Sequence, residues 1–254
     1  MRNSQQRHQF ILSTLQERQY CSVAELSQAT SVSEVTIRKD LQVLEQQQRL
    51  YRTYGGASTK NLYTSDRPLQ EKELVRADQK RRIAAAALPL IGTHDSLLIG
   101  SGTTVYALAQ QLTSATHLTV ITPALKVALV LLEQPNIEVV QLGGLLRPLS
   151  AATYGHAAEA MLAEASCGML FLGVDGIDLE KGLTITNLPE AKLNQRMMES
   201  AEMTVVLADS SKFGKRGLSK ICAVEQVQYL ITDHNAPAAV VKELEARGVT
   251  VLLV

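Results

Sequence analysis

The stretch that decides the fold of the N-terminal region is Ser33-Glu34-Val35-Thr36-Ile37-Arg38-Lys39-Asp40-Leu41. Successive helical residues are rotated by about 100°, so one face of this stretch and its continuation carries Ile37, Leu41 and Leu44. The opposite face carries Val35, Arg38, Lys39, Gln42 and Gln46. We therefore expect the first face to pack on a small domain and the second to stay exposed.

The exposed face carries the groups that read bases in the DNA major groove. Arg and Lys pair with guanine, Gln pairs with adenine, and a small apolar side chain packs on the thymine methyl. Arg38, Lys39, Gln42 and Val35 supply one of each kind or more. The pattern predicts a recognition helix.

The flanking residues predict the rest of a winged helix-turn-helix domain. Ser22-Val23-Ala24-Glu25 is a capping box, so a helix begins near Val23. After a polar turn, Ser33 is the expected cap of the recognition helix. The run Arg49-Leu50-Tyr51-Arg52-Thr53-Tyr54-Gly55-Gly56 predicts a two-stranded wing whose arginines touch phosphates. The predicted DNA contacts over residues 1–57 are Ser33, Val35, Thr36, Arg38, Lys39, Gln42, Arg49 and Arg52.

An alternative interpretation is a small three-helix domain with an ordinary solvated charged face. Charge separates the two only weakly, since residues 1–60 hold eight Lys or Arg against five Asp or Glu. A family resemblance favours DNA binding. Ser22 to Leu26, the string Thr36-Ile37-Arg38-Lys39-Asp40-Leu41 and Tyr54-Gly55-Gly56-Ala57 resemble the N-terminal domain of the DeoR family of bacterial transcriptional regulators. One departure is Gln47-Gln48-Arg49, where that family usually has a glycine.

Length and composition predict a globular protein of two unequal domains. The chain has 254 residues, of which 46% are hydrophobic, and a formal net charge of zero. No apolar run has the roughly 18 residues needed to span a bilayer, and no signal peptide opens the chain, so no membrane partner is expected. Cys21, Cys167 and Cys222 have no paired spacing, so we expect no disulfide, no metal and a cytoplasmic location.

Residues 58–76 have no sustained apolar period and are predicted to form a linker. From residue 77 to 254, apolar strand-like runs alternate with helical patterns, which predicts a doubly wound α/β domain with a buried parallel sheet. The predicted strands are Ser96–Ile99, Leu118–Thr122, Ile137–Leu142, Met169–Leu172, Thr204–Leu207, Tyr229–Thr232 and Val249–Leu253.

Ligands of such sheets bind at the carboxyl ends of the strands, and here those ends are polar and glycine-rich. Gly100-Ser101-Gly102-Thr103-Thr104 opens a helix with hydroxyls and amides that suit a phosphate, although a capped turn is the simpler interpretation. It is neither a P-loop nor a dinucleotide fingerprint, so no cofactor is expected. The predicted effector contacts are Ser101, Gly102, Thr103, Thr104, Gly143, Gly144, Arg147, Asp175, Gly176, Asp178, Asn187, Glu190 and Lys212.

The same segments resemble the C-terminal domain of the DeoR family. The matching strings are Ser101-Gly102-Thr103-Thr104, Leu142-Gly143-Gly144, Gly173-Val174-Asp175-Gly176-Ile177-Asp178 and Ala208-Asp209-Ser210-Ser211-Lys212-Phe213-Gly214. The resemblance implies a fold similar to ribose-5-phosphate isomerase and the sensing of phosphorylated sugars. Gly100, where many members carry an acidic residue, and His156, where proline is frequent, are departures.

Two functions follow from these observations. The first is a transcriptional regulator, expected to be a homo-oligomeric repressor of a sugar or nucleoside catabolic operon that a phosphorylated sugar relieves. The second is a sugar-phosphate isomerase-like enzyme in which Asp175, Asp178 and Glu190 transfer protons. Those isomerases carry a Lys-Gly-rich string after the paired aspartates, whereas residues 182–187 read Gly-Leu-Thr-Ile-Thr-Asn. We therefore expect no enzymatic activity and assign no catalytic residue.

Overall fold

The computed structural model describes residues 3–18, 20–47, 49–53, 55–58, 68–114 and 116–254. The chain divides into two compact units, Met1–Tyr63 and Thr64–Val254. Each unit has a hydrophobic core of its own.

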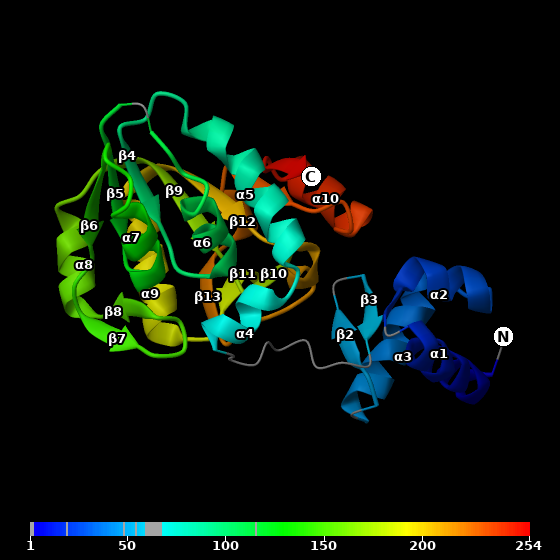
Figure 1. The fold of residues 1–254 in the computed structure, drawn as a ribbon. Coiled ribbons are helices and arrows are strands. Elements are labelled where there is room, and N and C mark those ends of the chain that lie inside the picture. Colours follow the sequence, from blue (N-terminus) through cyan, green and yellow to red (C-terminus); the bar gives the residue numbers. More distant parts are fainter. Residues whose placement is uncertain (1–2, 19, 48, 54, 59–67, 115) are drawn as a thin grey trace. The chain divides into compact units, whose positions relative to one another are not determined.

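The first unit is a winged helix-turn-helix domain, as the sequence predicts (Figure 1). Its core includes Ile37, Leu41 and Leu44, each at most 1% exposed, which confirms the predicted inner face of the recognition helix. Its elements are α1 (Ser4–Arg18), β1 (Tyr20–Ser22), α2 (Val23–Thr30), α3 (Glu34–Gln46), β2 (Tyr51–Thr53) and β3 (Gly56–Ser58).

Both predicted helix caps are present. The side chain of Ser22 accepts the amide of Glu25 at 3.1 Å, and the Glu25 carboxylate accepts the Ser22 amide at 2.7 Å, which completes the capping box. Ser33 caps α3 by accepting the amide of Thr36. These bonds fix where α2 and α3 begin and so set the turn between them.

The wing has one strand more than the sequence predicts. Strand β3 pairs with β2 and also with β1, so the sheet has three strands in the order β1-β3-β2. Gly56 permits this pairing because a Cβ there would collide with the carbonyl oxygen of Cys21. With only three residues, β1 is too short to show an alternating pattern in the sequence.

A seven-stranded parallel sheet forms the centre of the second unit, and it contains the seven strands that the sequence predicts. Its strand order is β15-β14-β12-β9-β4-β5-β6. The bounds are β4 (Ser96–Ile99), β5 (Leu118–Thr122), β6 (Ile137–Gln141), β9 (Cys167–Gly173), β12 (Ala201–Leu207), β14 (Tyr229–Thr232) and β15 (Thr250–Leu253).

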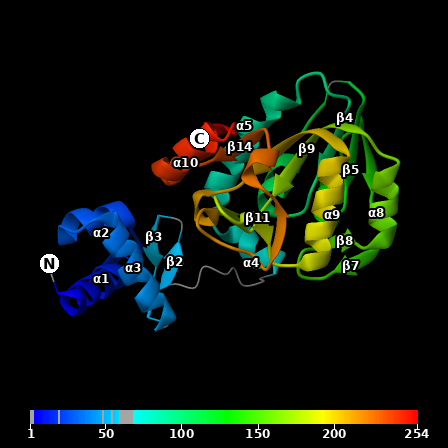
Figure 2. The ribbon, with the colours of Figure 1, turned by 180° about the vertical axis from the view of Figure 1, so that it is seen from behind.

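Helices cover both faces of this sheet, so the predicted doubly wound fold is confirmed (Figure 1, Figure 2). One core contains residues of α5 (Ala77–Ile91), α6 (Thr103–Ala109) and α7 (Leu125–Leu131). The other contains residues of α8 (His156–Ala163), α9 (Leu188–Glu199) and α10 (Ala238–Ala246).

Short antiparallel strands and 3-10 turns sit outside the main sheet, and the sequence did not predict them. Strands β10 (Gly176–Asp178), β11 (Gly182–Ile185) and β13 (Ser219–Cys222) form one small sheet. Strands β7 (Leu145–Arg147) and β8 (Ala152–Tyr154) form a hairpin. The turns are η1 (Ser210–Lys212) and η2 (Val224–Gln226).

The predicted linker, 58–76, requires a correction at both ends. Ser58 lies in β3, and residues 69–74 form a helix, α4 (Leu69–Leu74), that belongs to the second unit. None of the residues of α4 is buried, so it has no apolar period by which the sequence would reveal it. Residues 59–67 lie outside the described part of the chain.

Two absences concern the described residues alone. None of their helices has the length and apolar character to cross a bilayer. Nor do the described residues contain a group of His, Cys, Asp or Glu side chains suited to a metal ion. The three cysteines are free and buried.

Candidate functional site

The outer face of α3 presents the predicted base-reading side chains to solvent. Val35 is 61% exposed, and Arg38, Lys39 and Gln42 are exposed as well. An exposed valine on a helix whose other face is fully packed is a group with room to contact a thymine methyl. Ser33 and Thr36 lie at the start of the same helix, where their hydroxyls are 3.0 Å apart.

The arginines predicted to contact DNA have only weak competing partners within this unit. Arg38 pairs with Glu34 at 2.6 Å, one turn back on α3, and Arg52 pairs with Glu45 at 3.7 Å. All four side chains are exposed by 41% or more, so these pairs contribute at most about 1 kcal/mol each. Arg49 is exposed beside the wing. The arginines can therefore exchange these partners for DNA phosphates or bases.

A buried ion pair that the sequence did not predict holds α3 on α1. Asp40 accepts two hydrogen bonds from the Arg7 guanidinium, at 2.6 and 2.9 Å, and lies 3.0 Å from His8 Nε2. Burial raises the pKa of Asp40, but the hydrogen bonds from Arg7 and His8 outweigh it and hold that pKa below its ordinary value. Asp40 is thus a positioning residue for the exposed face of α3, not a DNA contact.

A pocket opens at the carboxyl ends of β4 and β9, where the chain order of the sheet reverses. Strands β5 and β6 follow β4 on one side, and β12, β14 and β15 follow β9 on the other. This switch point is where open α/β sheets bind ligands. The lining residues are Leu69, Lys72, Ser101, Gly102, Thr103, Thr104, Arg147, Leu149, Ser150, Gly173, Val174, Asp175, Ile185, Thr186, Glu190 and Lys212. We call this the strand-end pocket.

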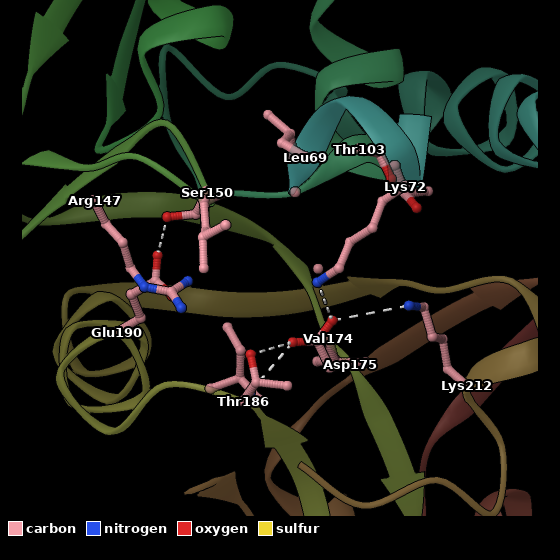
Figure 3. Close-up of a pocket in the computed structure, with 16 residues that line it drawn as sticks. Leu69, Lys72, Thr103, Arg147, Ser150, Val174, Asp175, Thr186, Glu190 and Lys212 are labelled. Atoms are coloured by element: carbon pink, nitrogen blue, oxygen red, sulfur yellow. Dashed lines mark hydrogen bonds and ion pairs between the residues drawn. The ribbon is translucent and has the colours of Figure 1, made fainter. Parts of the chain in front are cut away.

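Asp175 lies at the centre of the strand-end pocket between two lysines (Figure 3). Its carboxylate is 3.0 Å from Lys72 Nζ and 3.9 Å from Lys212 Nζ. The amide and hydroxyl of Thr186 donate to it at 3.3 Å. Burial raises the pKa of Asp175, but the two lysines outweigh it and lower that pKa, so the group is an anion.

A second ion pair forms another wall of the strand-end pocket (Figure 3). Arg147 Nη1 donates to Glu190 Oε2 at 3.0 Å, and the hydroxyl of Ser150 donates to Glu190 Oε1. Glu190 lies in the first turn of α9, and its side chain is 5% exposed. The pocket thus offers cations, carboxylates and hydroxyls to one ligand.

The loop between β4 and α6 supplies hydroxyls and one unusual backbone conformation. Ser101, Thr103 and Thr104 line the pocket with their neighbour Gly102. Gly102 has φ 123° and ψ 165°, which L-residues rarely adopt, and a Cβ there would meet no other atom within 4 Å. The glycine therefore serves the shape of the loop and leaves space beside it open.

The two predicted aspartates are separated in the structure. Asp178 turns away from the strand-end pocket, and its side chain is 1% exposed. It accepts the amides of Glu180 and Lys181 at 3.0 and 2.8 Å and the Arg216 guanidinium at 2.8 Å. Gly176 is also outside the lining, and a Cβ there would collide with the carbonyl of Lys215. Both residues shape the small sheet instead.

Three further predicted contacts have structural roles next to the strand-end pocket and do not line it. Asn187 caps α9 by accepting the amide of Glu190 at 3.1 Å, so it orients a residue that does line it. Gly144 has φ 124°, and a Cβ there would collide with the Tyr154 carbonyl across the hairpin. Gly143 precedes it in the same turn.

Sequence reasoning missed eight of the lining residues, which are Leu69, Lys72, Leu149, Ser150, Gly173, Val174, Ile185 and Thr186. Lys72 falls in the segment predicted to be a linker, and a lone lysine there carries no signal of a site. Thr186 lies in the run of residues 182–187 that distinguishes this chain from the isomerases, but the run alone does not show which side chains point inward.

Comparison with known proteins identifies both units. Residues 7–61 match the model of the DeoR-like helix-turn-helix domain, and residues 75–234 match that of the DeoR C-terminal sensor domain. A protein of Escherichia coli O157:H7, named as a transcriptional repressor of the aga operon, is 38% identical, covering 98% of this chain and 93% of its own. The glycerol-3-phosphate regulon repressor of Escherichia coli K12 is 28% identical, with 94% of both chains covered.

Among solved structures, ribose 5-phosphate isomerase A from Neisseria gonorrhoeae resembles this chain with a TM-score of 0.38 and 17% identity. The alignment covers 54% of this chain and 53% of the isomerase. At that level of similarity, the functional assignment has to come from the residues of the pocket and from the family.

Proposed function

This chain belongs to the DeoR family of transcriptional regulators, and we propose that it represses a sugar or nucleoside catabolic operon until a phosphorylated sugar releases it from its operator. The helix-turn-helix unit binds DNA, and the second unit senses the sugar. We infer repression, as opposed to activation, because two relatives are named as repressors, one of the aga operon and one of the glycerol-3-phosphate regulon. Because the target is DNA in a bacterial type of regulator, we place the protein in the cytoplasm.

The ligand class rests on the strand-end pocket. A phosphorylated sugar needs cations and hydroxyl donors for its phosphate, and carboxylates for its hydroxyls. Lys72 and Lys212 supply the cations beside the Ser101–Thr104 loop, and Asp175 and Glu190 supply the acceptors. The observation that carries the proposal is this convergence of opposite charges at the switch point of a chain that also has an exposed, capped recognition helix.

We propose further that the pocket holds the sugar without converting it. An isomerase needs a proton-transfer pair, and Asp178, the expected partner of Asp175, is bound to Arg216 and to two backbone amides. The segment Gly182–Asn187 brings no lysine in its place. The other carboxylate of the pocket, Glu190, is held by Arg147 and Ser150. These bonds favour binding over catalysis.

The proposed partners are double-stranded operator DNA, a phosphorylated sugar and further copies of this chain. One recognition helix reads about half a turn of DNA, so a homo-oligomer would place a second α3 in the next major groove. Effector binding would then act on the separation or orientation of the two helices.

Operator release by defined sugars tests the proposal. The purified chain is bound to a fluorescent fragment of its own promoter region at fixed salt, and anisotropy is followed during titration with each of a panel of sugar phosphates. Release by a sugar phosphate and not by its unphosphorylated parent is the expected result. Equal release by both would remove the phosphate from the recognition scheme, and steady conversion of the ligand would favour the isomerase.

A further inference from the structure

Helix α4 is attached to the second unit through the strand-end pocket itself. It supplies Lys72 and Leu69 to the lining, and Lys72 Nζ makes the shorter of the two ion pairs with Asp175 (Figure 3). Along the chain, α4 is the first element of this unit and follows the residues that lead from the DNA-binding unit. Lys72 therefore lines the pocket and also lies on the segment of chain that leads from the DNA-binding unit into the second unit.

Several polar contacts hold α4 in place. None of its residues is buried, and Leu74 at its end is 85% exposed. Its first amide, that of Leu69, donates to the carbonyl of Leu149 at 2.8 Å. Glu73 pairs with Lys126 at 2.5 Å.

The C-terminal end of α4 has two more polar anchors. Lys80, a buried lysine of α5, donates to the carbonyl oxygens of Lys72 and Val75. Arg76 donates to Ser210 Oγ at 2.9 Å and lies 3.7 Å from Asp209. Of the ion pairs that α4 makes, that of Lys72 with Asp175 has both its side chains in the lining of the strand-end pocket.

An anionic ligand would change the partner of Lys72. Asp175 is a single negative charge shared between two ammonium groups and also bonded to Thr186. A phosphate dianion carries more charge and more acceptor oxygens, so it competes for an ammonium group in the same pocket. The Asp175 carboxylate is then free to accept a sugar hydroxyl. Asp175 keeps Lys212 and Thr186 as partners after both exchanges.

We propose that Lys72 couples the sensor to the DNA-binding unit: effector phosphate takes Lys72 from Asp175 and holds α4 more firmly in a second position. This inference rests on the proposed function, since it assumes a phosphorylated effector. Lys212 contacts the same carboxylate from η1, which is not part of the connecting segment. Lys72 is therefore a coupling residue, whereas Lys212 serves affinity alone.

Paired substitutions in the full chain separate the two roles. Lys72→Met and Lys212→Met each remove one ammonium group and keep a similar side-chain length. The probes are glucose 6-phosphate, ribose 5-phosphate and glycerol 3-phosphate, and the most effective one is titrated until operator affinity stops changing. We call the fold decrease in operator affinity at saturating probe the release factor. Lys212→Met should need about tenfold more probe yet reach the wild-type value of this factor. Lys72→Met should reach a release factor below about twofold even at saturation. Lys72→Arg, which keeps the charge, should restore it.

Hydrogen exchange of the peptide covering residues 68–76 gives a second readout. In the wild-type chain the effective probe should slow exchange there, and in Lys72→Met this protection should be lost. A Lys72→Met chain with the wild-type release factor would overturn the coupling role, and so would faster exchange in the wild-type chain. If no probe binds or releases the wild-type chain, the proposed function itself fails. If probes release it and Lys72→Met is released equally, only the present inference fails.

Discussion

Gly102→Ala should lower the free energy of unfolding by an amount that follows from the backbone conformation of Gly102. Gly102 has φ 123° and ψ 165° at the start of α6, a region of backbone conformations that is nearly restricted to glycine. A non-glycine residue there costs about 1–3 kcal/mol of strain. A steric clash adds nothing, because a Cβ would meet no other atom within 4 Å. The added methyl group occupies space beside the pocket that Gly102 lines.

Gly155→Ala is a matched control. Gly155 stands at the same position of another helix, α8, with φ 99° and ψ −173°, and a Cβ there also meets no atom within 4 Å. It does not line the strand-end pocket. The free energy of unfolding should therefore fall by a similar amount in both variants, about 1–3 kcal/mol. Only Gly102→Ala should also raise the effector concentration for operator release, by about tenfold or more.

Two measurements decide the outcome. Denaturant unfolding of both variants gives the stability cost, and operator release titrated with the effective sugar phosphate gives the functional cost. Operator affinity without effector should stay at the wild-type value in both, since neither glycine lies in the first unit. If Gly102→Ala and Gly155→Ala responded to the effector equally, the glycine would serve only the fold, and the ligand would not approach the loop at Gly102.

Three further predictions concern single side chains. Arg38→Ala should weaken specific operator binding by about 1–3 kcal/mol at fixed salt, and an unchanged affinity would remove Arg38 from the reading face. Asp40→Ala leaves the Arg7 guanidinium buried without its carboxylate and should cost about 3–5 kcal/mol in denaturant unfolding; a loss below about 1 kcal/mol would contradict this. Burial lowers the pKa of Lys80 from 10.5 to about 8. At pH values between these two, Lys80 is protonated in the unfolded chain but not in the folded chain. The stability of the wild-type chain relative to Lys80→Met should therefore rise with pH across that window, by up to about 1.4 kcal/mol per unit, and a flat difference would show that Lys80 titrates normally.

The main sheet was predictable because its strands are buried on both faces. A strand such as β9, with Met169, Leu170, Phe171 and Leu172 all at most 1% exposed, has to be apolar throughout, and the sequence shows that directly. The caps of α2 and α3 were predictable for a related reason. Ser22 and Ser33 satisfy free backbone amides of their own helix, so the signal is entirely local.

Features held by distant polar contacts were not predictable from local patterns. Asp40 and Arg7 are 33 residues apart in the chain, and Lys72 and Asp175 are 103 apart. Neither pair leaves a periodic mark in the sequence. Helix α4 has no buried residue and is held by several polar contacts, which is why its sequence looks like that of a linker.

The two aspartates show how far a motif alone can locate a site. Asp175 and Asp178 stand three residues apart after the same strand, and both have the chemistry to bind a sugar. Between them the chain enters β10, where successive side chains point to opposite sides, and Asp178 faces Arg216 while Asp175 faces the two lysines. The composition of the strand ends therefore identifies the edge of the sheet at which the pocket lies. The direction of each carboxylate, however, depends on the antiparallel strands that follow. Because the bonds around those strands hold Asp178 outside the pocket, Asp175 is the one carboxylate at the pocket's centre. When a ligand phosphate draws Lys72 away, Asp175 keeps Lys212 and Thr186 as its partners.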